Sequence, residues 1–253
     1  MKQNLFKDVR PSEVVPGVFT WENCLEVPEG IVDIMNQEVD DWKAGITKDD
    51  VTNNDSMKSV YGANGPIRFD PEVNFHREES KVYLKQVQRN ALEKAASYMQ
   101  IFPDVKEEVN WMETWQYITY MPPKHMEFHS DNHAVRDPRT NKHHVAPYLR
   151  RFTILTYLND DFNGGSLVFR YFPNTAPYKP PAGSVVIMPS AYVWSHATTP
   201  LLNGRKAAFL VSMSSHYDVG SEEIGQPIED LARRELRWKT TQQWVVLKYI
   251  MIF

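Results

Sequence analysis

Hydrophobic residues in the second half of the chain follow the pattern of β-strands. Apolar and polar positions alternate from Arg151 to Leu158, which is typical of a half-buried strand. Apolar runs at 183–188 and 207–212 indicate buried strands, and 115–120 is rich in the aromatic and β-branched residues that favour strands. Turn residues separate these segments at regular spacing, which predicts an all-β barrel or jelly roll.

Turn residues also predict how some strands connect. Asn159, Asp160 and Asp161, followed by Gly164 and Gly165, supply the turn chemistry for a hairpin from strand 151–158 to a strand over 166–171. A strand over 12–21 is interrupted by a turn signal. A further turn near 180–183 leads into the apolar run at 183–188.

Helical periodicity appears in the first half of the chain. Apolar residues recur at helical spacing in 28–42 and again in 78–98; we expect the first helix to pack on the outside of a sheet and the Lys and Arg residues of the second to be solvated. The stretch 44–75 between them is rich in Gly, Asn, Asp and Pro and predicts a long loop. Arg68 and Tyr61 can reach a substrate from this loop; the alternative is a plain connector.

The end of the chain predicts a short amphipathic helix at 228–238 and an apolar tail at 244–253. The tail is too short to cross a membrane, so we expect it to pack on the barrel, pair with an edge strand or bury in an oligomer such as a dimer. We expect one domain over 1–253. Supporting helices and strands occupy 1–108, the catalytic core 109–215, and the final helix and tail 216–253.

Composition narrows the class of protein. The 253 residues, 42% hydrophobic and 24% charged, are ordinary for a globular domain. The net charge of −4 argues against general affinity for nucleic acid. Cys24 is the single cysteine, so no internal disulfide forms, and a reducing compartment is favoured. The first residues lack the apolar core of a signal peptide and no segment is a membrane span, which predicts a cytoplasmic protein.

Candidate chemistry lies within this β-rich half. Residues i and i+2 of a strand point to the same side, so His129 and Asp131 can face one point. His196 can supply a third ligand from another strand. Two imidazoles and one carboxylate on one face of an octahedron suit Fe(II) and leave the other face open. Arg205 or Lys206, shortly after His196, can hold the far carboxylate of a small diacid.

The basic stretch 132–150 offers a weaker signal. His143 and His144 do not predict a second metal site, because no carboxylate or cysteine accompanies them. We expect this stretch to flank the mouth of the site, where its charge would suit an acidic or phosphorylated substrate. A solvated loop is the alternative.

The order of motifs resembles that of a known family. Those motifs are Tyr120 nine residues before His129, the His129-x-Asp131 pair, the runs 156–161 and 164–169, Pro180-x-Ala182-Gly183-Ser184, and the stretch from His196 to Lys206. Together they are similar to the Fe(II)- and 2-oxoglutarate-dependent dioxygenases, in particular the prolyl 4-hydroxylase-like branch. The resemblance covers roughly residues 110–215.

The resemblance implies a fold and a set of cofactors. The fold would be mainly β with flanking helices, around a double-stranded β-helix (jelly-roll, cupin-like) core. The cofactors would be Fe(II), held by His129, Asp131 and His196, with 2-oxoglutarate as cosubstrate and O2; ascorbate is a further candidate.

It also implies a cosubstrate pocket. Lys206 matches the Gly-x-Lys pattern of the family and would bind the C5 carboxylate of 2-oxoglutarate. Arg205 would match other members, but neighbouring strand residues cannot both point inward, so we expect Lys206. Tyr120 and Tyr157 match positions that line this pocket, although either can equally be a core aromatic residue.

The implied activity is hydroxylation of a prolyl or other amino-acid residue in a peptide, coupled to conversion of 2-oxoglutarate to succinate and CO2. One alternative is oxidation of a free amino acid or small metabolite, by hydroxylation, desaturation, cyclisation or epimerisation. Another is a non-catalytic metal-binding barrel. A halogenase is disfavoured, because Asp131 occupies the place that halide needs. A peptide or amino acid is the expected partner, without nucleic acid or membrane.

Overall fold

The computed structural model describes residues 9–44, 65–132, 135–136, 143–144, 148–216 and 226–227. Its strands are β1 (Ser12–Val15), β2 (Val18–Trp21), β3 (Ile67–Phe69), β4 (Trp111–Met112), β5 (Gln116–Tyr120), β6 (Val135–Arg136), β7 (His143–His144), β8 (Tyr148–Tyr157), β9 (Asn163–Gly164), β10 (Leu167–Phe169), β11 (Ser184–Pro189), β12 (His196–Thr198), β13 (Leu201–Asn203), β14 (Lys206–His216) and β15 (Gln226–Pro227). Its helices are α1 (Ile31–Lys43), α3 (Pro71–Asn74), α4 (Glu78–Ile101), α5 (Pro103–Glu108) and the short 3-10 helix η1 (Tyr192–Trp194).

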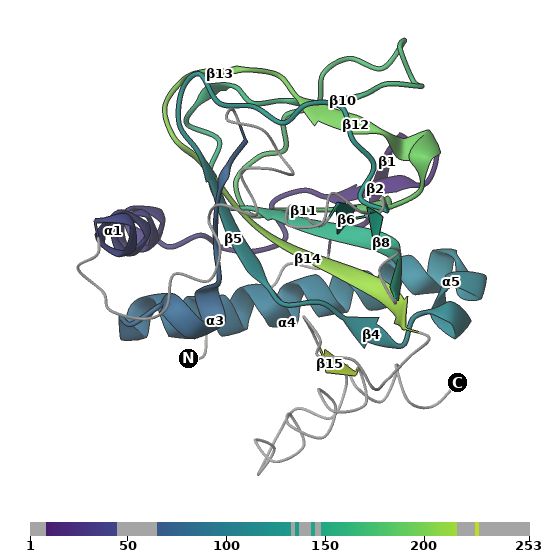
Figure 1. Ribbon diagram of the computed structural model, residues 1–253, viewed down its shortest axis with the longest axis horizontal. Helices are drawn as coiled ribbons and strands as arrows, with labels where there is room; N and C mark the ends of the chain where they lie inside the picture. Colours follow the sequence, from purple (N-terminus) through teal and green to yellow (C-terminus); the bar gives the residue numbers. More distant parts are fainter. Residues whose placement is uncertain are drawn as a thin grey trace.

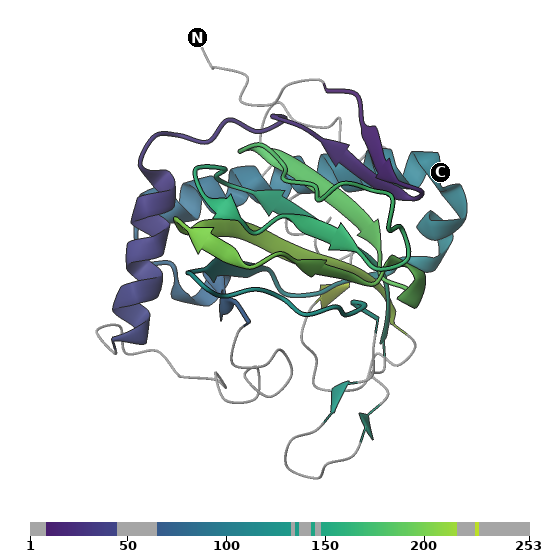
Figure 2. The ribbon, with the colours of Figure 1, turned by 90° about the horizontal axis from the view of Figure 1, so that it is seen from above.

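One antiparallel sheet organises the molecule. Its strands follow the order β1-β2-β11-β8-β14, and β14 then pairs with both β4 and β5. Strand β3 extends β5 and β15 extends β4. The short pairs β10–β12 and β9–β13 form a second layer over one face of this sheet, and α4 and α5 lie against the other (Figures 1 and 2). This arrangement confirms the predicted mainly β fold with flanking helices.

Alternation along the strands divides the core into two clusters. In β8, Phe152 and Ile154 belong to the cluster under the helices, whereas Leu155 and Tyr157 belong to the cluster between the sheet and the second layer. Side chains of a strand alternate between the two faces of its sheet, so each central strand fills both clusters. The inner strands read as almost continuous apolar runs for this reason.

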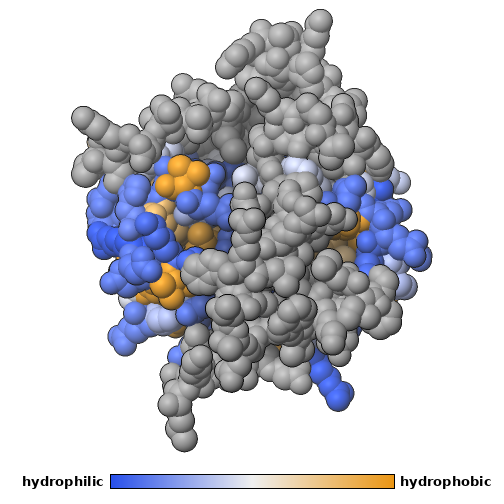
Figure 3. Space-filling view, turned by 90° about the horizontal axis from the view of Figure 1, so that it is seen from below, coloured by the Kyte–Doolittle hydropathy of each residue, from blue (hydrophilic) through white to orange (hydrophobic). Residues whose placement is uncertain are grey.

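The two helices predicted from periodicity are confirmed as α1 and α4. Their buried apolar residues, such as Met35 and Val39 of α1 and Val87 and Ala91 of α4, join the cluster on the helix side. The outer faces are polar. Seen from that side, the described residues are mainly hydrophilic, with small hydrophobic patches between them (Figure 3). None of the helices in the described ranges is long and apolar enough to be a candidate membrane span.

The predicted hairpin from 151–158 to 166–171 is wrong. Strand β8 pairs with β11 and β14, whereas β10 pairs with β12 in the second layer. Strand β8 already has a paired strand on each side, so β10 cannot pair with it and lies in the second layer instead. Turn residues mark the end of a strand but do not specify its partner strand.

The stretch 44–75 is not one long loop. It contains β3 and the short helix α3, which has the usual start signals of a helix. The Asp70 carboxylate accepts hydrogen bonds from the backbone N–H groups of Glu72 and Val73, and Pro71 occupies the first turn. Tyr61, the predicted helix at 228–238, the apolar tail at 244–253 and most of 132–150 lie outside the described residues.

Candidate metal centre

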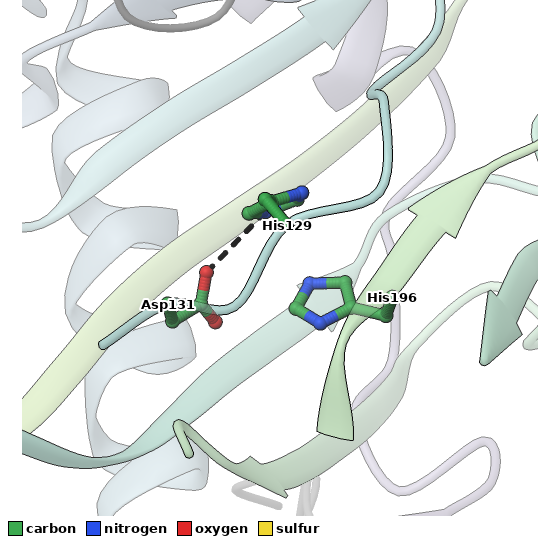
Figure 4. Close-up of side chains that lie close together, drawn as sticks. All are labelled: His129, Asp131 and His196. Carbon is green, nitrogen blue, oxygen red and sulfur yellow. Dashed lines mark ion pairs between the residues drawn. The ribbon is translucent and has the colours of Figure 1, made fainter. Parts of the chain in front are cut away.

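Two backbone hydrogen bonds bring the predicted histidines together. His129 N donates to the carbonyl of His196 at 3.0 Å, and His196 N donates to the carbonyl of His129 at 2.9 Å. Asp131 follows two residues after His129, and one ligand atom from each of the three side chains lies within 4.8 Å of the others. Figure 4 shows the three side chains directed toward one point.

The predicted strand through His129 and Asp131 is wrong in detail. His129 makes an isolated bridge with His196, and Asp131 lies in a bend. The ligand atoms of the two side chains nevertheless lie close to each other and to His196, which is all the metal site needs.

Hydrogen bonds select one nitrogen of each imidazole for a metal ion. His129 Nδ1 lies 2.7 Å from the carbonyl of Glu127, and His196 Nδ1 lies 3.0 Å from the carbonyl of Trp194. A carbonyl only accepts, so both Nδ1 atoms carry the proton. The Nε2 atoms are therefore the ligand atoms, oriented by backbone carbonyls as is usual for metal-binding histidines.

Burial and electrostatic interactions shift the pKa values of the three side chains. Burial lowers the pKa of His196 and keeps this imidazole neutral, as a ligand must be. Burial also opposes charge on His129, but the hydrogen bond and charge of Asp131 outweigh it and raise the pKa of His129. Burial alone would raise the pKa of Asp131; the two histidines instead hold that pKa well below its usual range. The carboxylate is ionised and ready to bind a cation.

One atom of the site points to a metal ion by itself. The Oδ2 atom of Asp131 is buried and has no hydrogen-bond partner among the described residues, while Oδ1 lies 3.4 Å from His129 Nε2. A buried carboxylate oxygen without a partner is costly, and a divalent cation would satisfy it. With two imidazole nitrogens beside it, this donor set fits Fe(II).

The triad lies in a pocket between the main sheet and the second layer. The pocket opens to solvent, and the space within it and at its mouth together is about 470 Å³. Its apolar wall consists of Ile118, Met126, Leu155, Leu167, Ala208 and Leu210. Its other polar residues are Arg68, Tyr120, Thr153, Tyr157, Thr198 and Lys206. A mostly apolar pocket with a few convergent polar groups is the usual form of a ligand site.

Lys206 lies in this pocket with its ammonium group buried. The residue is 2% exposed, and Nζ donates to the carbonyl of Gly165 at 2.7 Å. The rings of Tyr120 and Tyr157 lie 5.2 Å and 5.0 Å from Nζ. Burial, together with the charge of Lys179, lowers the pKa of Lys206 to about 7. Among the described residues no carboxylate forms an ion pair with it, so the group fits an anionic ligand such as 2-oxoglutarate.

Arg205 points to the other side of the sheet. Its Nη1 lies 2.6 Å from Asp40 Oδ2 of α1, and its Nε donates to Thr119 Oγ1 at 3.0 Å. The two neighbouring cations of the chain thus lie on opposite faces, and Lys206 is the one that lines the pocket.

Of two further pocket residues, one was predicted from the sequence and the other was not. Arg68 of β3 lines the pocket, as expected for a residue able to reach a substrate. Thr153 was not predicted, although it lies beside Asp131 and its hydroxyl lowers the pKa of that carboxyl. The alternation of β8 could have predicted it, because Thr153 lies on the same face of the strand as Leu155 and Tyr157, which also line the pocket.

Comparisons with known proteins agree with this geometry. Residues 115–211 match the family model of the 2OG-Fe(II) oxygenase superfamily. A search of curated proteins finds no match.

Several solved structures are similar. A prolyl hydroxylase from Trichoplax adhaerens, in complex with a hypoxia inducible factor oxygen degradation domain peptide fragment, has a TM-score of 0.50 and 16% identity over 79% of this chain and 84% of that chain. A prolyl-4-hydroxylase from Pseudomonas putida gives 0.47 and 14%, over 80% and 94%. The viral collagen prolyl hydroxylase of Paramecium Bursaria Chlorella virus-1 gives 0.42 and 15%, over 75% and 95%.

The likeness to the Trichoplax structure is one of fold, and it confirms the expected double-stranded β-helix core. The family match spans β5 to β14, the part of the chain that carries the two histidines, the aspartate and the pocket lysine. The residues of the candidate site therefore lie in the part of the chain, 115–211, that is similar to the 2OG-Fe(II) oxygenase superfamily.

Proposed function

We propose that the protein is an Fe(II)- and 2-oxoglutarate-dependent hydroxylase of prolyl or other amino-acid residues in a peptide or protein. The observation that supports it most directly is the presence, in one pocket, of a His129–Asp131–His196 triad and a buried lysine. Bound Fe(II), with 2-oxoglutarate and O2, supplies oxidation of a substrate C–H bond to C–OH, with release of succinate and CO2.

The residues of the pocket have separate roles in this proposal. His129, Asp131 and His196 would hold the metal ion, whose remaining coordination positions would be available to cosubstrate and O2. Lys206 binds the C5 carboxylate of 2-oxoglutarate, because a charge-assisted bond is about twice as strong as a neutral one. Tyr120 and Tyr157 form the walls around that carboxylate, and Arg205 has no part in its binding.

A peptide substrate is supported by the surface next to the metal centre. Phe128 immediately precedes His129, is 41% exposed, and lies under the guanidinium of Arg170 at 4.7 Å. Exposed aromatic side chains are typical contacts for proline-containing segments. The similar Trichoplax prolyl hydroxylase was solved with a peptide, which favours the same class of substrate here. We assign Arg68 to the primary substrate, because it lines the pocket on the side of His129.

Two alternatives make different use of the same pocket. A free amino acid or small metabolite could also enter this pocket, which is open to solvent, and its oxidation could end in hydroxylation, desaturation or cyclisation. A non-catalytic metal-binding barrel would have no use for the buried charge of Lys206. We also propose a cytoplasmic location, consistent with a single free cysteine, and ascorbate as an auxiliary reductant.

Succinate release tests the proposal. Purified protein loaded with Fe(II) is incubated with 2-oxoglutarate and O2 over a panel of proline-containing peptides, other peptides and free amino acids. We expect a peptide to stimulate succinate release and to gain the mass of one oxygen atom. The His196→Ala protein is the control and should release none. Stimulation by free amino acids alone would assign the substrate to the first alternative.

A further inference from the structure

We propose that Arg150 and Glu113 form a positioning clamp that holds the backbone at Asp131 and so keeps the metal-binding carboxylate in place. The inference rests on the proposed metal site. It assigns a role to two residues that lie outside the pocket and that no motif in the sequence indicates.

The clamp begins with a buried ion pair. Arg150 Nε lies 2.6 Å from Glu113 Oε1, and Arg150 Nη2 lies 2.6 Å from Glu113 Oε2. The Glu113 side chain is 5% exposed and also accepts a hydrogen bond from Ser214 Oγ at 3.0 Å. A bidentate arginine–carboxylate pair fixes the plane of the guanidinium as well as its position. The remaining nitrogen of Arg150 therefore has a defined direction.

That nitrogen contacts the metal-binding segment. Arg150 Nη1 donates to the backbone carbonyl of Asp131 at 3.0 Å. The next residue, Asn132, donates its backbone N–H to the carbonyl of Ser190 at 2.9 Å. These two bonds take the place of a sheet ladder, because the segment pairs with its neighbour only at the isolated bridge of His129. The position of the Asp131 backbone thus depends on Arg150.

The strand that carries Arg150 has a local irregularity at this point. Phe152 pairs with Met213 and Arg150 pairs with Ser214, so Arg151 is an extra residue between them. Extra residues of this kind are common beside active sites, where they redirect side chains. Here the irregularity accompanies an arginine that reaches out of the sheet to the ligand segment.

The adjacent arginine offers a matched comparison. Arg151 also binds a carboxylate, with Nη1 2.9 Å from Glu108 Oε2, and its Nε donates to Ser215 Oγ at 2.7 Å. Both arginines are about one-fifth to one-quarter exposed, at 21% for Arg150 and 24% for Arg151. In the part of the chain that the structure describes, Arg150 hydrogen-bonds to the backbone of Asp131, whereas the contacts described for Arg151 are with Glu108 and Ser215.

Metal affinity, measured without turnover, tests the clamp. Co(II) is titrated into metal-free protein as a redox-stable probe, and its affinity is read from the visible absorption of the bound ion; thermal unfolding of the metal-free protein is measured alongside. We expect Arg150→Met to weaken Co(II) binding about 10- to 100-fold, the usual effect of removing a group that orients a metal ligand. Arg151→Met should bind Co(II) with an affinity within about twofold of that of the unaltered protein. This should hold even if its unfolding temperature falls as much as that of Arg150→Met.

A conservative variant separates positioning from charge. Arg150→Lys keeps a cation opposite Glu113 but loses the planar fork, so we expect Co(II) binding to remain weakened. It also serves as the test if Arg150→Met does not fold. If a folded Arg150 variant, either Arg150→Met or Arg150→Lys, binds Co(II) with unchanged affinity, the clamp is overturned. Failure of the unaltered protein to bind Co(II) would overturn the metal site and the clamp with it, whereas normal binding by all variants would overturn the clamp alone.

Discussion

Lys206 has unfavourable surroundings for a charged side chain. Its ammonium group is almost fully buried, with one backbone carbonyl as its hydrogen-bond partner and aromatic rings around it. Burying a charge without a counter-ion is costly, and the lowered pKa expresses that cost. Such a group is retained where a ligand supplies the missing charge.

Replacing Lys206 should weaken cosubstrate binding selectively. Lys206→Met keeps most of the volume and removes the charge, so we expect the KM for 2-oxoglutarate to rise about 10- to 100-fold, from the loss of roughly 1.5–3 kcal/mol for a hydrogen bond to a charged group. Arg205→Met should leave this KM unchanged and lower the free energy of unfolding by at most about 1 kcal/mol, because its partner Asp40 is 44% exposed. Steady-state kinetics and urea unfolding measure both. The reverse order of effects on KM would assign the anchor to Arg205.

Binding of 2-oxoglutarate should also depend on pH. The pKa of Lys206 is lowered from 10.5 to about 7 by burial, so the free protein loses this proton as the pH rises through 7. A carboxylate favours the protonated form, so binding raises the pKa and takes up a proton above pH 7. By linkage, affinity should fall above about pH 7, approaching tenfold per pH unit. Below that pH, the lysine is already charged and this dependence disappears.

Calorimetric titration of 2-oxoglutarate into the Mn(II)-loaded protein, in buffers of different ionisation enthalpy, measures the proton uptake. Lys206→Met is the control, because it retains the ligand histidines and removes the lysine. Proton uptake of equal size in both proteins would assign the effect to another group.

At the scale of elements, strand β11 depends on the turn before it. Gly183 has φ +74°, and a Cβ added there would lie 2.0 Å from the carbonyl oxygen of Leu25. The backbone approaches this closely because Leu25 N donates to the Gly183 carbonyl and Gly183 N donates to that of Tyr157. The turn therefore joins the segment after β2 to the ends of β8 and β11.

Gly183→Ala should destabilise the protein more than a glycine substitution with the same backbone conformation. Gly30, at the start of α1, has φ +76° but no atom within 4 Å of an added Cβ. Gly30→Ala should thus cost only the left-handed strain, about 1–2 kcal/mol. Gly183→Ala should cost about 1–3 kcal/mol more, from steric overlap. Urea unfolding compares the two, and equal losses would contradict the close approach at Gly183.

At the scale of the whole molecule, the pocket joins two layers. His196 lies on β12 of the second layer, whereas Lys206 and Tyr157 lie on strands of the main sheet. A metal ion bound by the histidines and a dicarboxylate bound by Lys206 would link the layers through the site. Ligands that bind the folded state alone also stabilise it by mass action.

Mn(II) and 2-oxoglutarate together should therefore raise the unfolding temperature. At about 100 times the dissociation constant, one ligand adds about 2.7 kcal/mol. For a chain of this size each kcal/mol corresponds to roughly 2–4 °C, so we expect a rise of about 5–10 °C from each ligand and about 10–20 °C from both. Thermal denaturation with and without ligands measures the shift. His196→Ala should show little of it, and a shift of full size in that variant would contradict the metal site.

Much of the fold was predictable because it follows from local patterns. Helical periodicity located α1 and α4, and apolar runs located β5, β8, β11 and β14. The spacing of His129 and Asp131 and the order of motifs up to Lys206 predicted residues that the structure brings into one pocket. These features depend on the period of a strand or helix and on ligand chemistry, both of which are written along the chain.

Only the tertiary structure decided how distant segments meet. Strand β10 pairs with β12 instead of β8, since pairing depends on which edges are already occupied. The sequence favoured Lys206 over Arg205, but only the structure shows what each contacts: Lys206 lines the pocket and Arg205 binds Asp40 of α1. The contact between Arg150 and the backbone of Asp131 could not be predicted from the sequence. Every residue has a backbone carbonyl, so the residue type at position 131 does not indicate that its carbonyl accepts this hydrogen bond.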